Sequence, residues 1–475
     1  MKAKGVLVLC VLFFTSLVVC RAVVIPVTHD EASTWLNYRY YNLWSCLSDY
    51  WCWHTANNHW LNTLLMQWCG GLFGEKAWAL RLPNILAGGL YFLVAALIST
   101  RYIHSQWLRV TGFLLLSAHV YLLDFFSLFR GYGLMSCGLL WGVYCFLRYS
   151  EKYIFRWLLA AVLAMIFAVL ANFTALLPFV SFAVTWLFWL LIHGRFSLLL
   201  RHGVLWILTV LVFAFLLAYP IRMLNGSGEF EWGSAGPLAM LTDLMGNLLY
   251  GFQYFGDLSP TYLLWGFLAL LLFVGCLFVL IKSVDVKNQW LLTLVLLIAN
   301  IGLVVVHQKV TGSQAPVGRK SIYLIPFLFM PLVLGLNLIT RKTSVLFFSI
   351  LFSGALLYHS FRPRLWASCR EWYYDAYYPE LLSSILPDGS SGDSIGLGSS
   401  WIFNPSLTFY QKTRSLPITG LVYQKPLLPD SLMQYYYVEQ VDTFGLRAYN
   451  FLLEKRIGPF FLFKKGVPLL PPDPQ

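Results

Sequence analysis

The sequence predicts an all-α polytopic membrane protein with a large first external loop and a small external α/β domain at its C-terminal end. Of its 475 residues, 59% are hydrophobic and only 11% are charged, against roughly 25% charged in ordinary globular domains. The mean hydropathy is +0.67. Apolar stretches of about 20 residues, the length of a membrane-spanning helix, recur along most of the chain. These observations exclude a soluble enzyme, a disordered protein and a fibre.

About eleven of these stretches are predicted to be transmembrane helices, because a helix pairs all its backbone groups inside a bilayer. The first is expected to be a retained span and not a cleaved signal peptide, since no small-residue cleavage site follows Cys20-Arg21. The predicted spans are about 5–25, 78–100, 108–126, 131–148, 155–171, 174–192, 203–220, 260–281, 290–306, 322–340 and 344–360.

Charge predicts how these spans are oriented. Short loops on one side carry most of the basic residues, such as Arg101, Lys152 and Arg195, and the acids gather on the other side. The positive-inside rule therefore places the N-terminus in the cytoplasm, and an odd number of spans places the C-terminal segment outside. The net charge of +12 arises from these scattered residues, and no basic run favours nucleic acid as a partner.

Two regions are predicted to make up the chain: a transmembrane domain, 1–360, and a soluble external domain, 361–475. The first external loop, 26–77, contains no stretch of spanning length and is expected to form short amphipathic helices at the interface. Cys46, Cys52 and Cys69 in this loop are candidates for a disulfide. Turn-rich segments and alternating runs such as 434–438 indicate strands in the external domain.

Polar residues are concentrated on the external side. The pair Asp30-Glu31 follows the first span closely, where adjacent acids are costly unless they have a function. The structural alternative makes Asp30 the N-cap of a helix that begins near Glu31. The cluster 57–62, Asn-Asn-His-Trp-Leu-Asn, is rich in hydrogen-bond donors and suits either helix capping or contacts to a sugar or phosphate.

Further polar residues lie at the ends of later spans. Asp124 closes the third span and Arg130 precedes the fourth, so that the two either form a salt bridge or serve a function. The stretch Arg81-Leu82-Pro83-Asn84 leads into the second span, and Gly318-Arg319-Lys320-Ser321 opens a late one. The sequons Asn172-Phe173-Thr174 and Asn225-Gly226-Ser227 also occur, but such matches are common by chance.

These motifs, in this order and on one side of the membrane, resemble the GT-C class of polytopic glycosyltransferases. The marks are Asp30-Glu31, the stretch from Leu72-Phe73-Gly74 to Arg81-Leu82-Pro83-Asn84, the segment 126–132 (Phe-Ser-Leu-Phe-Arg-Gly-Tyr) and the segment 318–326. Within the class, the chain resembles the branch that contains protein O-mannosyltransferases and the lipid A aminoarabinose transferase. The resemblance covers about 1–340. Many relatives carry a lysine and a proline pair where this chain has Asn57-Asn58-His59.

The resemblance implies transfer of a sugar from a polyprenyl-phosphate donor to a hydroxyl of a lipid, glycan or protein acceptor, with inversion at the anomeric carbon. Such a reaction needs a base for the acceptor hydroxyl and cations for the departing phosphate. Asp30 is predicted to be the base, Glu31 to orient the loop or tune Asp30, and Asp124 to position Arg130 or contact the acceptor. The predicted contacts to phosphate or sugar are Asn58, His59, Arg81, Arg130, Tyr132, Arg319 and Lys320.

Several alternatives stay open at this stage. A divalent metal bound by His29, Asp30, Glu31 and Asp124 is one, although no ligand spacing supports it and no metal ligands are assigned. A ligase or polymerase that uses a whole lipid-linked glycan is the nearest functional alternative. A transporter or flippase would carry paired charges near mid-span or broken half-helices, and a membrane assembly protein would only bind a partner. The absence of an endoplasmic-reticulum retrieval signal favours a bacterial inner membrane with a periplasmic active site.

Overall fold

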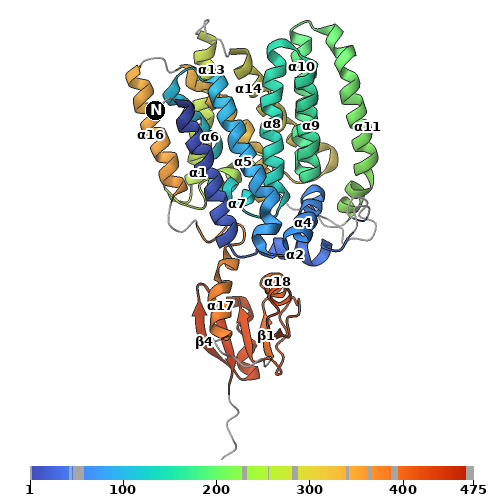
Figure 1. Cartoon of the computed structure of the whole chain (residues 1–475), viewed down its shortest axis with the longest axis vertical. Helices are drawn as coiled ribbons and strands as arrows, with labels where there is room; N and C mark the ends of the chain where they lie inside the picture. The colour runs from blue at the N-terminus through green and yellow to red at the C-terminus, as the bar shows by residue number, and fades with distance from the viewer. Residues whose placement is uncertain are drawn as a thin grey trace, which may run out of the picture.

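The described residues before Phe361 are mostly helical in the computed structural model, which describes residues 3–41, 45, 58–226, 233–254, 256–280, 287–338, 342–361, 366–386 and 394–466. The long helices run side by side as a bundle (Figure 1). With the shorter α6, α7, α12 and α15 included, the helices of the bundle are α1 Ala3–Val24, α5 Ala77–Tyr102, α6 Gln106–Ser117, α7 Val120–Phe126, α8 Gly131–Lys152, α9 Phe155–Ala171, α10 Leu176–Ile192, α11 Phe196–Gly226, α12 Pro237–Leu248, α13 Ser259–Leu280, α14 Lys287–Thr311, α15 Ile325–Gly335 and α16 Lys342–Ser360.

Fewer helices than expected are suited to crossing a membrane. Among the described residues, seven helices are long and apolar enough by length and composition, or eight if the bent pair α6 and α7 forms one span. That pair, predicted as one straight span, bends by 64° between Ser117 and Val120. α9 has only 17 residues, and α8 is not among the seven helices. Among the described residues a helix lies at each predicted stretch, but the predicted count of eleven spans is not confirmed.

The first external loop forms two helices where it is described, α2 (His29–Tyr38) and α4 (Trp60–Phe73). Both lie across one end of the bundle (Figure 1). α2 is fixed by a capping box, in which the Thr28 side chain and the Glu31 carboxylate each bond the other residue's backbone. Asp30 is therefore not the N-cap, as the structural alternative supposed. Asn57, Cys46 and Cys52 lie outside the described residues.

A small mixed sheet follows the last helix of the bundle. η5 (Tyr373–Tyr377) and α17 (Tyr378–Ile385) lead into β1 (Ile395–Ser399), α18 (Asn404–Arg414), β2 (Ile418–Thr419), β3 (Tyr435–Val438), β4 (Phe451–Ile457) and β5 (Phe460–Lys465). The strand order is β2-β1-β3-β5-β4. β1 is parallel to both of its neighbours, and β5 is antiparallel to β3 and β4. The predicted strand at 434–438 corresponds to β3.

This sheet domain packs against the first external loop. The rings of Trp35 and Phe409 meet edge to face with centroids 4.9 Å apart. The backbone N–H of Val27 donates to the Tyr410 hydroxyl over 2.7 Å. Val27 and Trp35 are buried in one apolar cluster with residues of α17, α18 and the sheet. Burial of this apolar surface fixes the domain beside α2.

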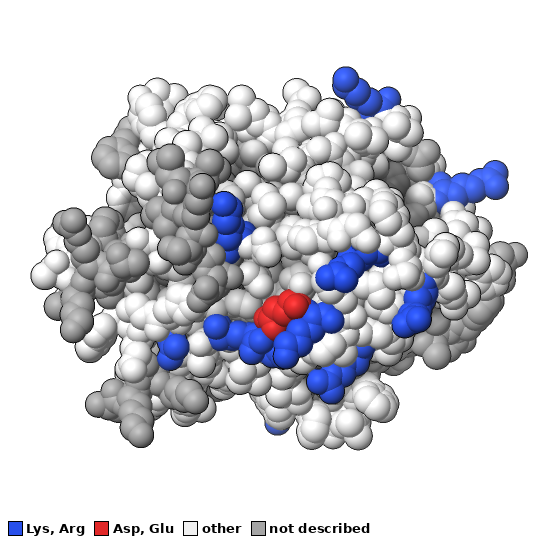
Figure 2. All heavy atoms as spheres, turned by 90° about the horizontal axis from the view of Figure 1, so that it is seen from above, with Lys and Arg blue, Asp and Glu red and all other residues white. Residues whose placement is uncertain are grey.

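The opposite end of the bundle is basic. The last turn of α5 carries Arg101, and that of α8 carries Lys152. Figure 2 looks down on that end, and Lys and Arg clearly outnumber Asp and Glu there. Glu151 is one acid there, and it pairs with Arg101 at 2.5 Å. Positive charge therefore gathers at the end of the bundle away from the sheet domain.

Candidate active site

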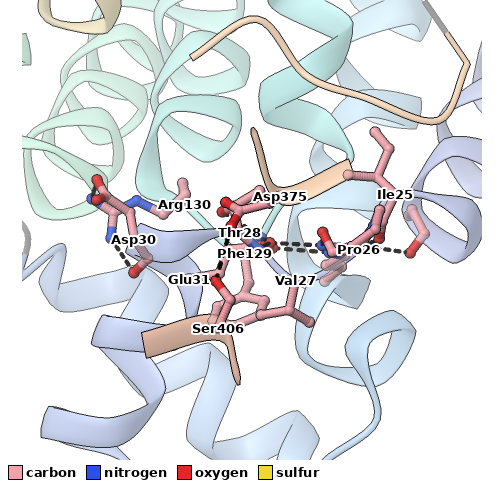
Figure 3. A network of polar contacts seen from close by, with 12 residues as sticks. Ile25, Pro26, Val27, Thr28, Asp30, Glu31, Phe129, Arg130, Asp375 and Ser406 are labelled. Atoms are coloured by element: carbon pink, nitrogen blue, oxygen red, sulfur yellow. Dashed lines mark hydrogen bonds and ion pairs between the residues drawn. The ribbon is translucent and has the colours of Figure 1, made fainter. Parts of the chain in front are cut away.

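The site is centred on Asp30, in the first turn of α2. Its carboxylate oxygen Oδ2 lies 2.8 Å from the guanidinium of Arg319 and 3.4 Å from that of Arg130. Arg130 is the N-cap of α8, and Arg319 is the second residue of η2 (Gly318–Leu324). Three segments distant in sequence thus bring together one carboxylate and two cations, all of them residues that the sequence analysis singled out. Figure 3 shows Asp30 and Arg130 side by side.

Burial and charge act in opposite directions on Asp30. Its side chain is almost fully buried, and burial alone would raise the pKa of the carboxyl group. The guanidinium groups of Arg319 and Arg130 outweigh burial, with help from His29 and a hydrogen bond from Trp372, and they hold the pKa of Asp30 below its usual range. Asp30 is therefore a carboxylate at neutral pH.

Glu31, the neighbour of Asp30, has a different set of partners. Both of its oxygens are bound by Arg81, at 2.9 and 2.6 Å, and both residues are fully buried. Glu31 also accepts hydrogen bonds from the backbone N–H groups of Thr28 and Phe129 (Figure 3). Its carboxylate thus ties the start of α2 to α5 and to the segment before α8.

Arg81 has no N–H group left for a ligand. Besides its bonds to Glu31, it donates to the carbonyl oxygens of Ala22, Ile25 and Pro26 at 2.7–3.0 Å. These bonds use all five donors of the guanidinium. The geometry therefore argues against the predicted contact between Arg81 and a sugar or phosphate, and it makes Arg81 a clamp on the chain between α1 and α2.

Asp124 pairs with Arg21 and not with Arg130, so the structure contradicts the predicted role of Asp124 in positioning Arg130. Its carboxylate also accepts from the Tyr250 hydroxyl over 3.0 Å and from the Arg370 backbone N–H over 3.0 Å. The physical reason is that Arg130 is already engaged by Asp30, whereas Arg21 reaches Asp124 from the last turns of α1. Asp124 therefore holds α1, α7 and the turn after α12 together.

His59 and Tyr132 lie next to Arg130. The Nε2 atom of His59 is 3.4 Å from the Arg130 guanidinium, and the ring of Tyr132 packs against the imidazole with centroids 4.9 Å apart. Asn58 is buried and accepts from the Thr63 hydroxyl over 3.2 Å. Lys320 is half-buried beside Arg319. The structure thus brings His59 and Tyr132 to the same side of the site as Arg130.

The segment that joins the bundle to the sheet domain contributes residues that the sequence did not single out. The Trp372 ring lies 5.0 Å from the guanidinium of Arg319. Glu371 accepts from the Tyr121 hydroxyl over 2.5 Å. Asp375 accepts from the backbone N–H of His29 over 2.7 Å, directly beside Asp30. In the sequence, their only signal is the cluster of acids and aromatics over 371–375. That cluster is far from Asp30 in sequence, so nothing connected it with the site.

An apolar hollow of about 470 Å³ opens between the helices on the α12 side of the site. It lies beside the contact between Asn247 of α12 and the Arg370 side chain, since the next residue, Leu248, lines the hollow. Other lining residues come from α13, α15 and α16, among them Leu263, Phe267, Leu332 and Leu356.

The residues considered for a metal are not brought together. Glu31 is occupied by Arg81, and Asp124 by Arg21. Among the described residues, no group of three or more His, Cys, Asp or Glu side chains could hold a metal ion.

The chain matches no protein-family model and no curated protein. Its structure is similar to the crystal structure of ArnT from Cupriavidus metallidurans bound to undecaprenyl phosphate, with a TM-score of 0.54 and 13% identity, over 98% of this chain and 99% of that chain. The apo form of that ArnT also gives a TM-score of 0.54, with 12% identity over 96% and 97%. The resemblance to GT-C glycosyltransferases is therefore confirmed at the level of the fold.

Proposed function

We propose that this protein is a membrane glycosyltransferase, which moves a sugar from a polyprenyl-phosphate donor to an acceptor hydroxyl at the external face of the membrane. One observation carries the proposal. The Asp30 carboxylate is held between Arg319 and Arg130 in a fold that matches, along nearly its whole length, a protein bound to undecaprenyl phosphate. A buried base beside two phosphate-binding cations suits this reaction.

Donor binding would prepare Asp30 for catalysis. Without a donor, Arg319 and Arg130 keep the pKa of Asp30 low, and a weakly basic carboxylate is a poor proton acceptor. A phosphate bound between the arginines would neutralise much of their charge. The effect of burial on Asp30 would then dominate and raise its pKa. Asp30 would therefore become a stronger base only when the donor is in place.

The transfer itself then needs only groups of this site. The acceptor oxygen attacks the anomeric carbon of the sugar, and its proton passes to Asp30. The bond between that carbon and the phosphate oxygen breaks, and polyprenyl phosphate leaves with its negative charge held by Arg130 and Arg319. Attack opposite the leaving phosphate inverts the anomeric centre.

The apolar interior of the bundle suits a donor that is a lipid. The apolar hollow beside α12 would take part of the isoprenoid chain, since it is lined by side chains such as Leu263 and Phe267. Tyr132 and His59 would flank the phosphate or the sugar. We assign Lys320 and Asn58 supporting contacts at the rim, and we assign Glu31 to the loop that carries Asp30.

The orientation of the site follows from charge. The positive-inside rule places the basic end of the bundle in the cytoplasm. Asp30 and the sheet domain then face the outside, which is the periplasm if the protein belongs to a bacterial inner membrane. The acids of the site gather at this one end, which favours an enzyme over a transporter.

The exchange Asp30→Asn tests the proposal, because it preserves size and removes the basic carboxylate. We expect turnover of a polyprenyl-phosphate sugar by purified protein in nanodiscs to fall roughly 100-fold or more, while the melting temperature stays near that of the wild type. Asp257→Asn, which removes a carboxylate from the exposed turn before α13, is the matched control. Equal turnover in both variants would remove Asp30 from the chemistry. Transport of the lipid without release of polyprenyl phosphate would favour a flippase.

A further inference from the structure

The ring of His59 is held from one side by two hydrogen-bond donors. The backbone N–H of Gly131, the first residue of α8, lies 3.0 Å from the His59 Nδ1 atom. A helix N-terminus has backbone N–H groups without partners in the helix, and such a group can only donate. Nδ1 of His59 therefore accepts this bond and carries no proton.

Asn172 provides the second donor. Its side-chain nitrogen lies 3.3 Å from the same Nδ1 atom. The orientation of the amide is fixed, because its oxygen accepts from the backbone N–H and the hydroxyl of Thr174, over 3.0 and 2.9 Å. Asn172 is only 5% exposed, so its amide lies in the protein interior.

A neutral imidazole with an unprotonated Nδ1 carries its proton on Nε2. Burial, together with Arg130 and Arg319, holds the pKa of His59 well below its usual range, which keeps the ring neutral at pH 7. The Nε2–H group then faces the N–H groups of Arg130 over 3.4 Å. Two donors facing each other in a buried site do not bond each other, but both can bond an acceptor placed beside them.

We propose that Asn172 and the α8 N-terminus fix His59 as the Nε2–H tautomer, and that this N–H and Arg130 form a subsite for one oxygen of the donor phosphate. Asn172 is a positioning residue that acts through His59. Gly131 is required for the arrangement, because a Cβ atom there would lie 2.4 Å from His59 Nδ1 and 1.9 Å from the Ala171 carbonyl oxygen. The inference rests on the proposed function for the identity of the anion.

The exchange Asn172→Asp tests this assignment with little change in shape. An aspartate keeps the bonds from Thr174 but turns a charged acceptor toward Nδ1, and this charge outweighs the neutral N–H of Gly131 and favours a proton on Nδ1. At low pH the ring becomes an imidazolium and keeps its Nε2–H group. The aspartate raises the pKa of His59 above its wild-type value. As the pH rises through that pKa, the ring becomes neutral, keeps the proton on Nδ1 and loses the Nε2–H donor to phosphate.

Affinity for undecaprenyl phosphate in nanodiscs is the measurement, taken from pH 5.5 to pH 8.5 as the ratio of variant to wild type so that ionisation of the phosphate cancels. We expect the ratio for Asn172→Asp to stay near one at the acid end and to fall by roughly 10-fold or more at the alkaline end, the loss of one hydrogen bond to a charged group. Asn450→Asp, which adds the same charge at an exposed turn of the sheet domain, should give a flat ratio.

Nitrogen NMR of histidine-labelled wild-type protein gives a second test that needs no exchange at Asn172, with the His59 signals identified by their loss in His59→Gln. The Nδ1 resonance of His59 should be that of an unprotonated ring nitrogen. A protonated Nδ1, or an affinity ratio for Asn172→Asp as flat as the control, would overturn the inference. A wild type that binds no undecaprenyl phosphate at all would instead overturn the proposed function.

Discussion

Replacing Glu31 by glutamine is expected to destabilise the protein through the clamp that carries Asp30. The Glu31 carboxylate accepts two bonds from Arg81 and one each from the backbone N–H groups of Thr28 and Phe129. A glutamine has one oxygen to accept these bonds, and its NH₂ group would face donors on the other side. The exchange also leaves the Arg81 guanidinium, which is fully buried, without an opposite charge.

The expected cost follows from this burial. Removing one partner of a buried ion pair costs about 3–5 kcal/mol, because the remaining charge stays uncompensated. The Glu380–Lys455 pair provides the matched control, since its atoms are 2.9 Å apart but both side chains are nearly half exposed. Glu380→Gln is expected to cost about 0–1 kcal/mol.

Thermal unfolding of the purified variants in one detergent measures the difference. Glu31→Gln should unfold at a clearly lower temperature than the wild type, and Glu380→Gln within error of it. The double exchange Glu31→Leu with Arg81→Met should recover part of the loss, because it removes both buried charges together. If Glu31→Gln unfolded at the same temperature as Glu380→Gln, the clamp would not stabilise the loop, and the argument from burial would be refuted.

Three further predictions follow from the contacts of the site. Arg319→Ala should weaken binding of undecaprenyl phosphate by about 1.5–3 kcal/mol. Arg319→Lys should weaken it less, because lysine keeps the charge but loses the bidentate geometry. Equal affinities of wild type and variants in a binding titration would contradict the phosphate contact. Arg21→Gln should reduce the yield of folded protein, and adding Asp124→Asn should restore part of it on size-exclusion chromatography, whereas a lack of rescue would argue against their pairing. Asp375→Asn should make thermal stability less dependent on pH, because burial raises the pKa of Asp375 well above its usual range. The contribution of Asp375 to stability is therefore complete below about pH 4 and is lost as the pH rises through the raised pKa. An unchanged pH profile of the melting temperature would contradict this.

The positions of the helices could be predicted because they depend on local composition. Each long apolar run lies in a helix, and the two short helices of the first loop follow from its amphipathic pattern. The number of spans could not be predicted, since the run over 108–126 does not reveal the 64° bend before Val120.

Part of the site could be predicted because charged residues at one end of a bundle are close in space. Asp30, Arg130 and Arg319 meet on that basis. Asp124 was wrongly connected with Arg130 because the two are near in sequence, whereas long-range packing of α1 against α7 supplies Arg21. Trp372 reaches the site only through the path of the chain after α16, which no local pattern encodes.

The central claim is that the protein consumes a polyprenyl-phosphate sugar and that Asp30 is the base. Mass spectrometry of lipid-linked sugars and surface glycans tests it most directly, in cells that produce the wild type, Asp30→Asn or no protein. We expect one polyprenyl-phosphate sugar to accumulate in the cells with no protein and in those with Asp30→Asn, and the same sugar to be lost from a surface glycan. Identical lipid and glycan profiles in all three would contradict the claim.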